Sequence, residues 1–346
     1  MRRRTKRIGS RRATIYTIIL IAMLAISYMR DEIAPRLQEI FHAEQSTAPT
    51  TLAKGREATP LTEEMPAPQG SESPTSPRTE ERSAPAIKPI AMPELPQIQV
   101  SEENYITTHR SGEVRNYTVC YSSIHHSPLW VAAPMHRSYE GDTKRKDNYT
   151  FDPTLPVNVQ TRLNSSYGEY TRGHMLGSAE RNASRELNDQ TFYVTNIAPQ
   201  LREGFNQMGG AWNNLESFVD KQVCADTLYL VTGAIYEPYT DSNGELIPAR
   251  TTINKNDEQE VGVPTAYYKV MLRTKSGTTG RSIAECTSEE LKCAAFIVGH
   301  RSAKGRKPSA EDMLSVRELE QLTGIDFFAT VPHAPETEAD PKDWGL

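Results

Sequence analysis

Runs of apolar and β-branched residues separated by turn residues predict strands in the second half of the chain. Residues 117–122 and 129–133 are two such runs on either side of Ser127-Pro128, a pattern that predicts a hairpin. Further strands are predicted at 191–197, 227–233, 266–273 and 294–299. The run at 227–233 is continuously apolar and ends in glycine, which favours a central strand.

Two segments have helical spacing instead. In residues 211–223 the apolar side chains fall on one face, at Trp212, Leu215, Phe218 and Val219. Residues 309–322 show the same spacing and begin with Ser309 and Asp312, a pair typical of a capping box. Strands with interspersed helices predict an α+β fold.

The N-terminus has the pattern of a membrane-targeting segment. Residues 1–12 carry seven arginines and lysines, and residues 13–29 are apolar without a charge. Seventeen residues is at the short end of the roughly 17–25 that cross a bilayer. We expect a transmembrane signal anchor with the basic tail in the cytoplasm and the rest of the chain outside it. A cleaved signal peptide, which would release the protein, is the alternative.

Residues 30–98 are predicted to form a flexible linker before a domain at 99–346. Ten of the 23 prolines lie between Pro49 and Pro96, among Ser, Thr, Glu and Ala. Such a segment buries too little apolar surface to offset its conformational entropy.

The charge balance does not favour a nucleic-acid binder. The chain has 39 Lys/Arg and 44 Asp/Glu, a net charge of −5, and residues 1–98 hold 14 of the basic but only 11 of the acidic residues. The predicted domain is therefore more acidic than the whole chain. A nucleic acid would have to bind at a local basic cluster.

The four cysteines allow two interpretations. An even number behind a membrane-targeting segment permits two disulfides, with Cys286–Cys293 closing the shortest loop and Cys120–Cys224 remaining. Four buried free thiols are the alternative. No C-x-x-C pair is present, so a zinc ribbon is not expected.

Candidate chemistry begins at Thr171-Arg172-Gly173-His174. A neutral imidazole can take a proton from water near neutral pH. On a strand, Arg172 and His174 share a face, where the guanidinium can bind a phosphate oxygen. Taken singly, a structural histidine and a surface salt bridge explain these two residues equally well.

Asn206 and Glu216 carry oxygen ligands of the kind that Mg²⁺ accepts. Asn206 precedes the predicted helix, and Glu216 lies within it, four residues after Trp212. A hard cation that keeps most of its waters suits one amide oxygen and a nearby carboxylate. Taken singly, Asn206 can be a helix cap and Glu216 a solvated side chain.

The ordered set of motifs resembles the sugar-non-specific DNA/RNA endonuclease family, which is endonuclease G-like and of the ββα-metal (His-Me finger) type. That family carries D-R-G-H, then T/S-N-x-x-P-Q, F/L-N-Q/R, a tryptophan and L-E. The counterparts here are T-R-G-H (171–174), T-N-I-A-P-Q (195–200), F-N-Q (205–207), Trp212 and Leu215-Glu216. The resemblance covers roughly residues 100–333.

The resemblance implies a central antiparallel sheet flanked by helices and a Mg²⁺-dependent endonuclease acting on DNA and RNA, with Mn²⁺ as an alternative metal. It implies that His174 is the general base, Asn206 the direct metal ligand and Glu216 the holder of a metal-bound water. It also implies the remaining site residues: Arg172 and Arg145 as phosphate contacts and Asn196 as a positioning residue. The sequence does not specify an oligomeric state, and a homodimer is compatible with it.

Three departures from the family pattern bear on activity. Thr171 stands where the family has aspartate, and Met208-Gly209 is a two-residue insertion before Trp212. Asp220 stands one turn after Glu216, where the family often has arginine. These departures motivate a second hypothesis, a catalytically silent nucleic-acid-binding protein of the same fold, tethered at the membrane. A third hypothesis is a cysteine hydrolase that uses Cys120 with His125 or His126.

Overall fold

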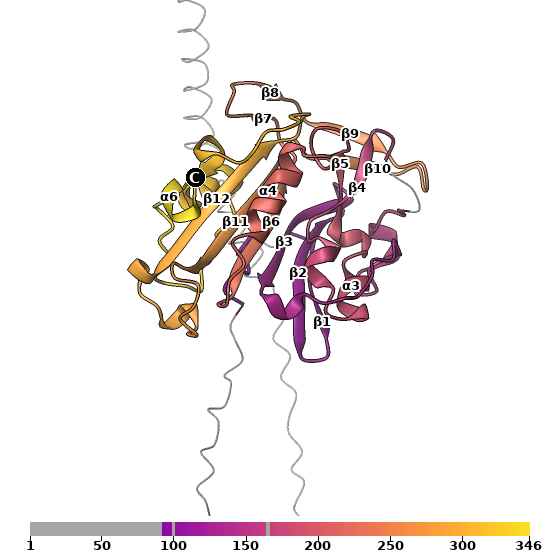
Figure 1. Ribbon diagram of the computed structural model, residues 1–346. Coiled ribbons are helices and arrows are strands. Elements are labelled where there is room, and N and C mark those ends of the chain that lie inside the picture. Colours follow the sequence, from indigo (N-terminus) through magenta and orange to yellow (C-terminus); the bar gives the residue numbers. More distant parts are fainter. Residues whose placement is uncertain (1–91, 99–100, 164–166) are drawn as a thin grey trace, which may run out of the picture. The chain divides into compact units, whose positions relative to one another are not determined.

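The computed structural model describes residues 92–98, 101–163 and 167–346 (Figure 1). All of them belong to the compact unit Ala84–Leu346. The predicted basic tail, the anchor at 13–29 and the linker up to residue 91 lie outside the described residues. Within the described part of the chain, no helix has the length and apolar character needed to cross a membrane.

A seven-stranded antiparallel sheet forms the centre of this unit. Its strand order is β1-β2-β3-β6-β11-β12-β13. The strands are β1 (Asn104–Ser111), β2 (Val114–Ser122), β3 (Ser127–Met135), β6 (Leu228–Ile235), β11 (Ala266–Thr274), β12 (Leu291–Gly299) and β13 (Met313–Leu314). The predicted hairpin and the strands at 227–233, 266–273 and 294–299 are confirmed as β2–β3, β6, β11 and β12.

Both faces of the sheet are buried, because alternate side chains of each central strand pack into different apolar clusters. On β11, Tyr267 and Met271 face one cluster, while Tyr268 and Val270 face the other. The first cluster includes Trp212 from helix α4 (Ala211–Asp220), which lies over β6 and β11 in Figure 1. Burial on both faces explains why these strands are continuously apolar rather than alternating.

Helix α5 (Val316–Thr323) covers the second face. Val316 and Leu319 pack there with Phe327 and Phe328 from the following segment. The other helices are α3 (Arg185–Gln190) and α6 (Pro341–Trp344). Single 3-10 turns complete the helical structure, among them η3 (Val157–Val159), η4 (Ser178–Arg181), η5 (Val194–Asn196) and η8 (Ala310–Asp312).

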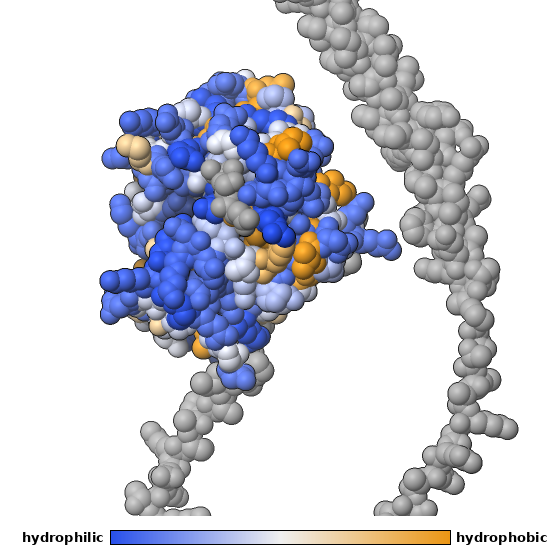
Figure 2. Space-filling view, turned by 90° about the vertical axis from the view of Figure 1, so that its right-hand side faces the viewer, coloured by the Kyte–Doolittle hydropathy of each residue, from blue (hydrophilic) through white to orange (hydrophobic). Residues whose placement is uncertain are grey.

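Among the residues that the structure describes, three two-stranded sheets lie outside the central one. They pair β4 (Tyr170–His174) with β5 (Ile197–Leu201), β7 (Tyr239–Thr240) with β8 (Leu246–Ile247), and β9 (Arg250–Ile253) with β10 (Glu260–Val263). A small apolar cluster that contains Tyr170, Ile197 and Val261 joins the β4–β5 pair to β10. The face of the unit toward β9, β10 and α3 is mostly hydrophilic, with a few separate apolar patches (Figure 2).

Two predicted elements are wrong in their boundaries. Residues 191–197 are not one strand, because Val194–Asn196 form the turn η5 and the strand begins at Ile197. Asn196 therefore precedes a strand and does not end one. The helix predicted at 309–322 begins only after Ser315, whose hydroxyl caps α5 by accepting from the Glu318 amide. The Ser309–Asp312 pair does form a capping box, but it caps the start of the short turn η8 and not the start of the α-helix.

The four cysteines are free thiols, so neither Cys286–Cys293 nor Cys120–Cys224 is joined by a disulfide. Cys120 and Cys293 are buried in β2 and β12, and the thiol of Cys286 donates to the Ser282 carbonyl, at 3.5 Å. The thiol of Cys224 instead donates to the carbonyl of Asp226, at 3.2 Å.

Residues 92–98, which the sequence assigned to the linker, pack against the domain. The carboxylate of Glu94 is fully buried and forms an ion pair with Arg115. The backbone of Gln97 exchanges two hydrogen bonds with Asp326, of 2.8 and 3.0 Å. The residues that pack as part of the domain thus include some before the predicted boundary at 99.

Candidate active site

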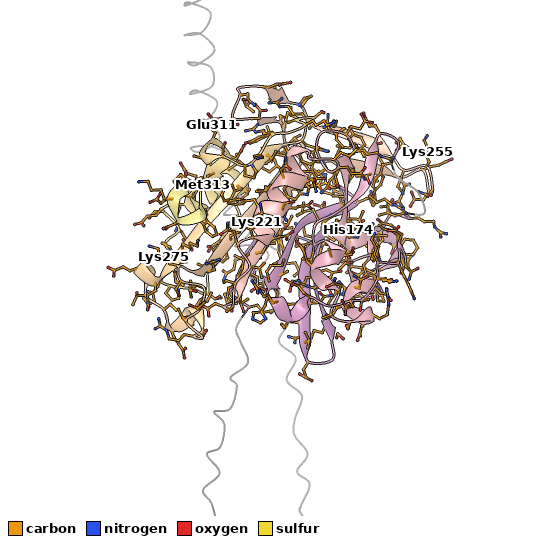
Figure 3. The ribbon with its side chains drawn as sticks, in the orientation of Figure 1. His174, Lys221, Lys255, Lys275, Glu311 and Met313 are labelled. Atoms are coloured by element: carbon orange, nitrogen blue, oxygen red, sulfur yellow. The ribbon has the colours of Figure 1, made fainter. Side chains whose placement is uncertain are left out.

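The β4–β5 pair holds the Arg172–His174 motif. His174 is the last residue of β4 (Figure 3) and faces Ile197, the first residue of β5. Arg172 lies two positions earlier on the same strand, as predicted. Gly173 between them leaves room for the buried Gln200 side chain, because a Cβ at Gly173 would lie 2.2 Å from Cδ of Gln200.

His174 sits among aromatic rings with one ring nitrogen unpaired. Its ring meets Phe192 edge-on, with centroids 5.0 Å apart, and lies 5.8 Å from the ring of Tyr149. The main chain of Arg172 hydrogen-bonds the imidazole, while the buried Nε2 has no partner in the described structure. Burial lowers the pKa of His174 to about 3, with further lowering from Arg145 and Arg172. The imidazole is therefore neutral at pH 7 and has a free proton acceptor.

Two arginines flank this histidine. The guanidinium of Arg172 lies 3.7 Å above the centre of the Tyr149 ring and donates to the Leu163 carbonyl, at 2.9 Å. Arg145 donates to the hydroxyl of the same tyrosine, at 3.3 Å, and its Nε pairs with Asp147, at 2.6 Å. Arg145 is exposed, so its charge is accessible from solvent. A guanidinium pair beside a neutral base is an arrangement that suits a phosphate group.

Asn206 joins this site through Gln200. The amide nitrogen of Asn206 donates to Oε1 of Gln200, the side chain that crosses over Gly173. This bond uses the nitrogen, so the carbonyl oxygen is the atom of Asn206 that suits a cation. The turn that holds Asn206 is joined to α4, because the amide of Asn213 on that helix donates to the Phe205 carbonyl, at 3.1 Å. The Met208-Gly209 insertion is absorbed here, with both residues at positive φ and Met208 80% exposed.

Glu216 lies on α4 in a negatively charged environment. Burial raises the pKa of its carboxyl to about 8; the positive charge of Lys269 opposes the rise, and Glu180 and Asp220 add to it. Asp220, one turn later, has its pKa raised to about 6 by burial and by Glu180. Lys269 is buried on β11, where its Nζ donates to Thr232, at 3.1 Å, and lies 4.9 Å from the Trp212 ring.

These donors fit a divalent cation that keeps most of its waters. Asn206 and Glu216 offer hard oxygen ligands, and burial together with the charges of Glu180 and Asp220 raises the pKa of Glu216 although Lys269 opposes the rise. Among the described residues no three His, Cys, Asp or Glu side chains are grouped to enclose a metal. A metal here would therefore rely on few protein ligands.

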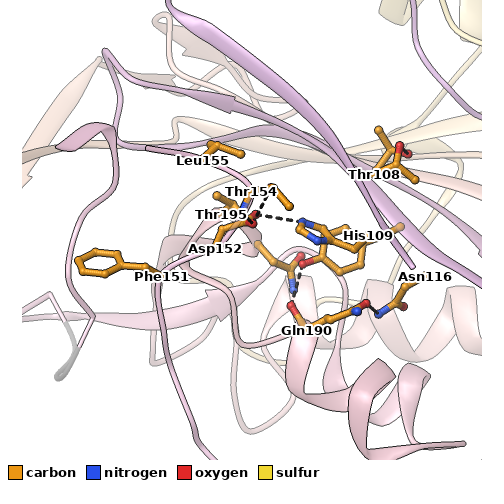
Figure 4. Close-up of polar contacts among 12 residues, drawn as sticks. Thr108, His109, Asn116, Phe151, Asp152, Thr154, Leu155, Gln190 and Thr195 are labelled. Carbon is orange, nitrogen blue, oxygen red and sulfur yellow. Dashed lines mark hydrogen bonds and ion pairs between the residues drawn. The ribbon is translucent and has the colours of Figure 1, made fainter. Parts of the chain in front are cut away.

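Asn196 acts on the main chain behind His174. Its Oδ1 accepts from the Leu176 amide, and its Nδ2 donates to the carbonyls of Leu176 and Thr191, at 2.8 to 3.0 Å. Next to it, Thr195 donates to the buried Asp152, at 2.6 Å, and Asp152 pairs with His109, at 3.0 Å (Figure 4). This buried network fixes the chain that follows His174, a positioning role.

The sequence did not predict several residues that build the site. Gln200, Tyr149 and Phe192 hold Asn206, the arginines and the imidazole in place, yet their types alone indicate no chemistry. Lys269 had a visible signal, because it is the single charge inside the apolar run Ala266–Leu272. The cysteine-hydrolase hypothesis is wrong: Cys120 is fully buried in the sheet, and burial raises its pKa to about 12.

Comparison with known proteins identifies the family. The family model described as DNA/RNA non-specific endonuclease matches residues 101–334, which include every candidate site residue. The chain belongs to this family. The expected central antiparallel sheet is also found in a solved EndoG chain from an EndoG/EndoGI complex, with a TM-score of 0.50 and 23% identity over 64% of this chain and 85% of that one.

Curated members of the family from distant organisms align with most of the domain. Human mitochondrial nuclease EXOG is 28% identical over 64% of this chain and 57% of its own length. Human mitochondrial endonuclease G is 24% identical over 62% of this chain and 68% of its own. A nuclease of Nostoc sp. is 28% identical over 70% of this chain and 80% of its own. The match thus spans less than two thirds of the length of EXOG.

Proposed function

We propose that this protein is a divalent-cation-dependent endonuclease that hydrolyses phosphodiester bonds of DNA and RNA, with His174 as general base. The observation that carries the proposal is a neutral imidazole with an unpaired Nε2 in the field of two nearby arginines. Family membership supports the reaction class. Mg²⁺ is the proposed metal, with Mn²⁺ as the alternative.

In this mechanism His174 takes a proton from a water molecule as the water oxygen attacks phosphorus. The bond from phosphorus to the 3′ oxygen breaks, and the 3′ oxygen leaves with a proton from solvent, which gives a 5′-phosphate end. Arg172 and Arg145 bind the non-bridging oxygens and balance their charge. Asn206 and Glu216 would hold the cation, which would supply charge stabilisation in the transition state.

The test is cleavage of plasmid DNA and of RNA by the purified protein with Mg²⁺. Removal of a general base costs about 10²–10⁴-fold, so His174→Ala should lower kcat by about a thousandfold. His333→Ala, which changes an exposed histidine of the C-terminal segment, is the matched control and should cut normally. Equal cutting by the two variants would refute His174 as the base.

A catalytically silent nucleic-acid-binding protein is the second candidate. The observation that favours it is the group of Glu180, Glu216 and Asp220: burial raises the pKa values of Glu216 and Asp220, and the charge of Glu180 adds to both shifts. Binding of an oligonucleotide by fluorescence anisotropy, without cleavage in Mg²⁺, Mn²⁺ or Ca²⁺, would establish it.

We also propose that residues 13–29 tether the protein to a membrane with the nuclease domain outside the cytoplasm. The uncharged run behind a basic tail supports the proposal. Alkaline carbonate extraction of membranes from cells that express the full chain would retain an anchored protein and release one whose signal had been cleaved.

A further inference from the structure

A cavity opens beside the candidate active site. It has a volume of about 260 Å³ and is lined by Tyr149, Thr150, Phe151, Arg162, Leu163 and Val194. Tyr149 belongs to both places, because its ring carries the guanidinium of Arg172 and lies 5.8 Å from His174. A group bound in this cavity would therefore be adjacent to a phosphate held by Arg172 and Arg145.

The walls of this cavity are fixed by hydrogen bonds. Asp257 accepts from the amide of Arg162, at 2.6 Å, and the fully buried Asn254 donates to the Arg162 carbonyl, also at 2.6 Å. Among the other lining residues, Thr150 exchanges backbone hydrogen bonds with Phe192 and Val194, of 3.2 and 3.0 Å. The cavity is thus built by loop segments that hydrogen bonds hold in place, and little backbone entropy would be lost on filling it.

Its lining suits a flat, uncharged ring. Arg162 lies 5.6 Å from the Phe151 ring centre, so a guanidinium and a phenyl ring stand together at the wall. Leu163 and Val194 are buried and apolar. The six lining residues include no carboxylate. The cavity near Asp220 differs, because it is lined by Glu140 and Glu180 as well and would repel a nucleic-acid strand.

We propose that the cavity lined by Tyr149, Phe151 and Arg162 binds the nucleobase next to the scissile phosphate by stacking. The proposal rests on the proposed endonuclease function and deepens it. Aromatic and guanidinium planes stack on any base, so such a subsite accepts DNA and RNA without reading the sequence. Stacking would also let an acidic protein bind its substrate through contacts that do not depend on the charge of the phosphates.

The test compares two single-stranded oligonucleotides of equal length: one of thymidine nucleotides, and one in which every nucleotide is an abasic tetrahydrofuran analogue. Both present the same phosphates, and only one presents bases. Wild-type full-length protein with Mg²⁺ should cleave the thymidine strand with a kcat/KM about tenfold higher. Phe151→Ala and Arg162→Ala should each lose most of this preference, mainly through a higher KM for the thymidine strand.

Arg281→Ala is the matched control, because it removes an exposed arginine that pairs with Glu290 and should keep the tenfold preference. Equal cleavage of the two strands by wild type would overturn the proposal, as would variants that lose the same factor on both strands. Failure of the endonuclease function would look different, since wild type would cut neither strand. In that case, fluorescence anisotropy would compare the binding of the thymidine and abasic strands. Tighter binding of the thymidine strand by wild type, lost in Phe151→Ala and Arg162→Ala, would support the subsite, and equal binding would overturn it.

Discussion

At the scale of single residues, the environment of His174 determines its protonation state. An ordinary histidine has a pKa near 6.5, and protonation near neutrality would remove its ability to act as a base. Here burial beside Phe192 and the nearby arginines keep the ring neutral far below that pH. The lowered pKa destabilises the folded state at acidic pH, because the unfolded chain binds the proton more readily.

We therefore predict that the imidazole of His174 does not titrate between pH 5 and 8 in the metal-free protein. Because its folded pKa is below its unfolded pKa, this group makes folding less favourable as pH falls from about 6.5 toward 3. NMR of isotope-labelled histidine, assigned by comparison with His174→Asn, measures the titration directly. A midpoint near 6.5 would contradict the burial argument.

The roles that the resemblance implies for Arg145, Arg172, His174, Asn206 and Glu216 remain predictions. In the structure, Tyr149 contacts Arg145, Arg172 and His174, and Asn206 bonds to Gln200. The sequence names the residue types and leaves out their surroundings. It could not indicate that Tyr149 would stack under Arg172 or that Lys269 would face Glu216 from the sheet. Those relations join segments far apart in the chain, and no local pattern encodes them.

At the scale of elements, the β4–β5 pair depends on close packing at one glycine. Gly173 leaves space for Gln200, and Gln200 holds the amide of Asn206. The proposed base and the proposed metal ligand are therefore coupled through one buried side chain.

We predict that Gly173→Ala disrupts this coupling. Its Cβ would overlap Gln200, so we expect a loss of about 1–3 kcal/mol in unfolding free energy together with a fall in cleavage rate. Gly177→Ala is the matched control, because its Cβ would meet the nearest atom, in Glu180, at an ordinary 3.5 Å. Urea unfolding and plasmid cleavage measure the two effects. A fully active, equally stable Gly173→Ala protein would show that the overlap is relieved elsewhere.

Apolar runs predicted the central strands well but failed where local capping decides the boundary. β6, β11 and β12 are buried on both faces, so their continuous apolar pattern is unambiguous. Ser309 and Ser315 are both residue types that cap helices well. The helix begins after Ser315 because Met313 and Leu314 form β13, which pairs with β12. β1 was missed because its sequence, Asn-Tyr-Ile-Thr-Thr-His-Arg-Ser, is mostly polar at the edge of the sheet.

At the scale of the whole molecule, the folded unit uses residues from before the predicted domain boundary. Glu94 is fully buried against Arg115, which is itself only 11% exposed. Removal of one partner of a buried ion pair is costly because the other charge remains without compensation.

We predict that a protein of residues 84–346 is more stable than one of residues 99–346, by about 3 kcal/mol. The shorter protein loses Glu94 and the backbone pairing of Gln97 with Asp326. Urea unfolding of both proteins gives the difference, and Glu94→Gln in the longer protein isolates the share of the ion pair. Equal midpoints for the two lengths would mean that this segment does not contribute to the fold.

The central sheet, which is buried on both faces, also separates substitutions that affect stability from substitutions that affect the proposed activity. The proposed catalytic side chains lie with α4 and β4–β5, whereas α5, Phe327 and Phe328 fill the opposite side. Substitutions on the α5 side of the sheet can therefore change the stability of this protein without touching the proposed catalytic side chains on the other side. Attempts to raise the heat resistance of the protein should start with the α5 side.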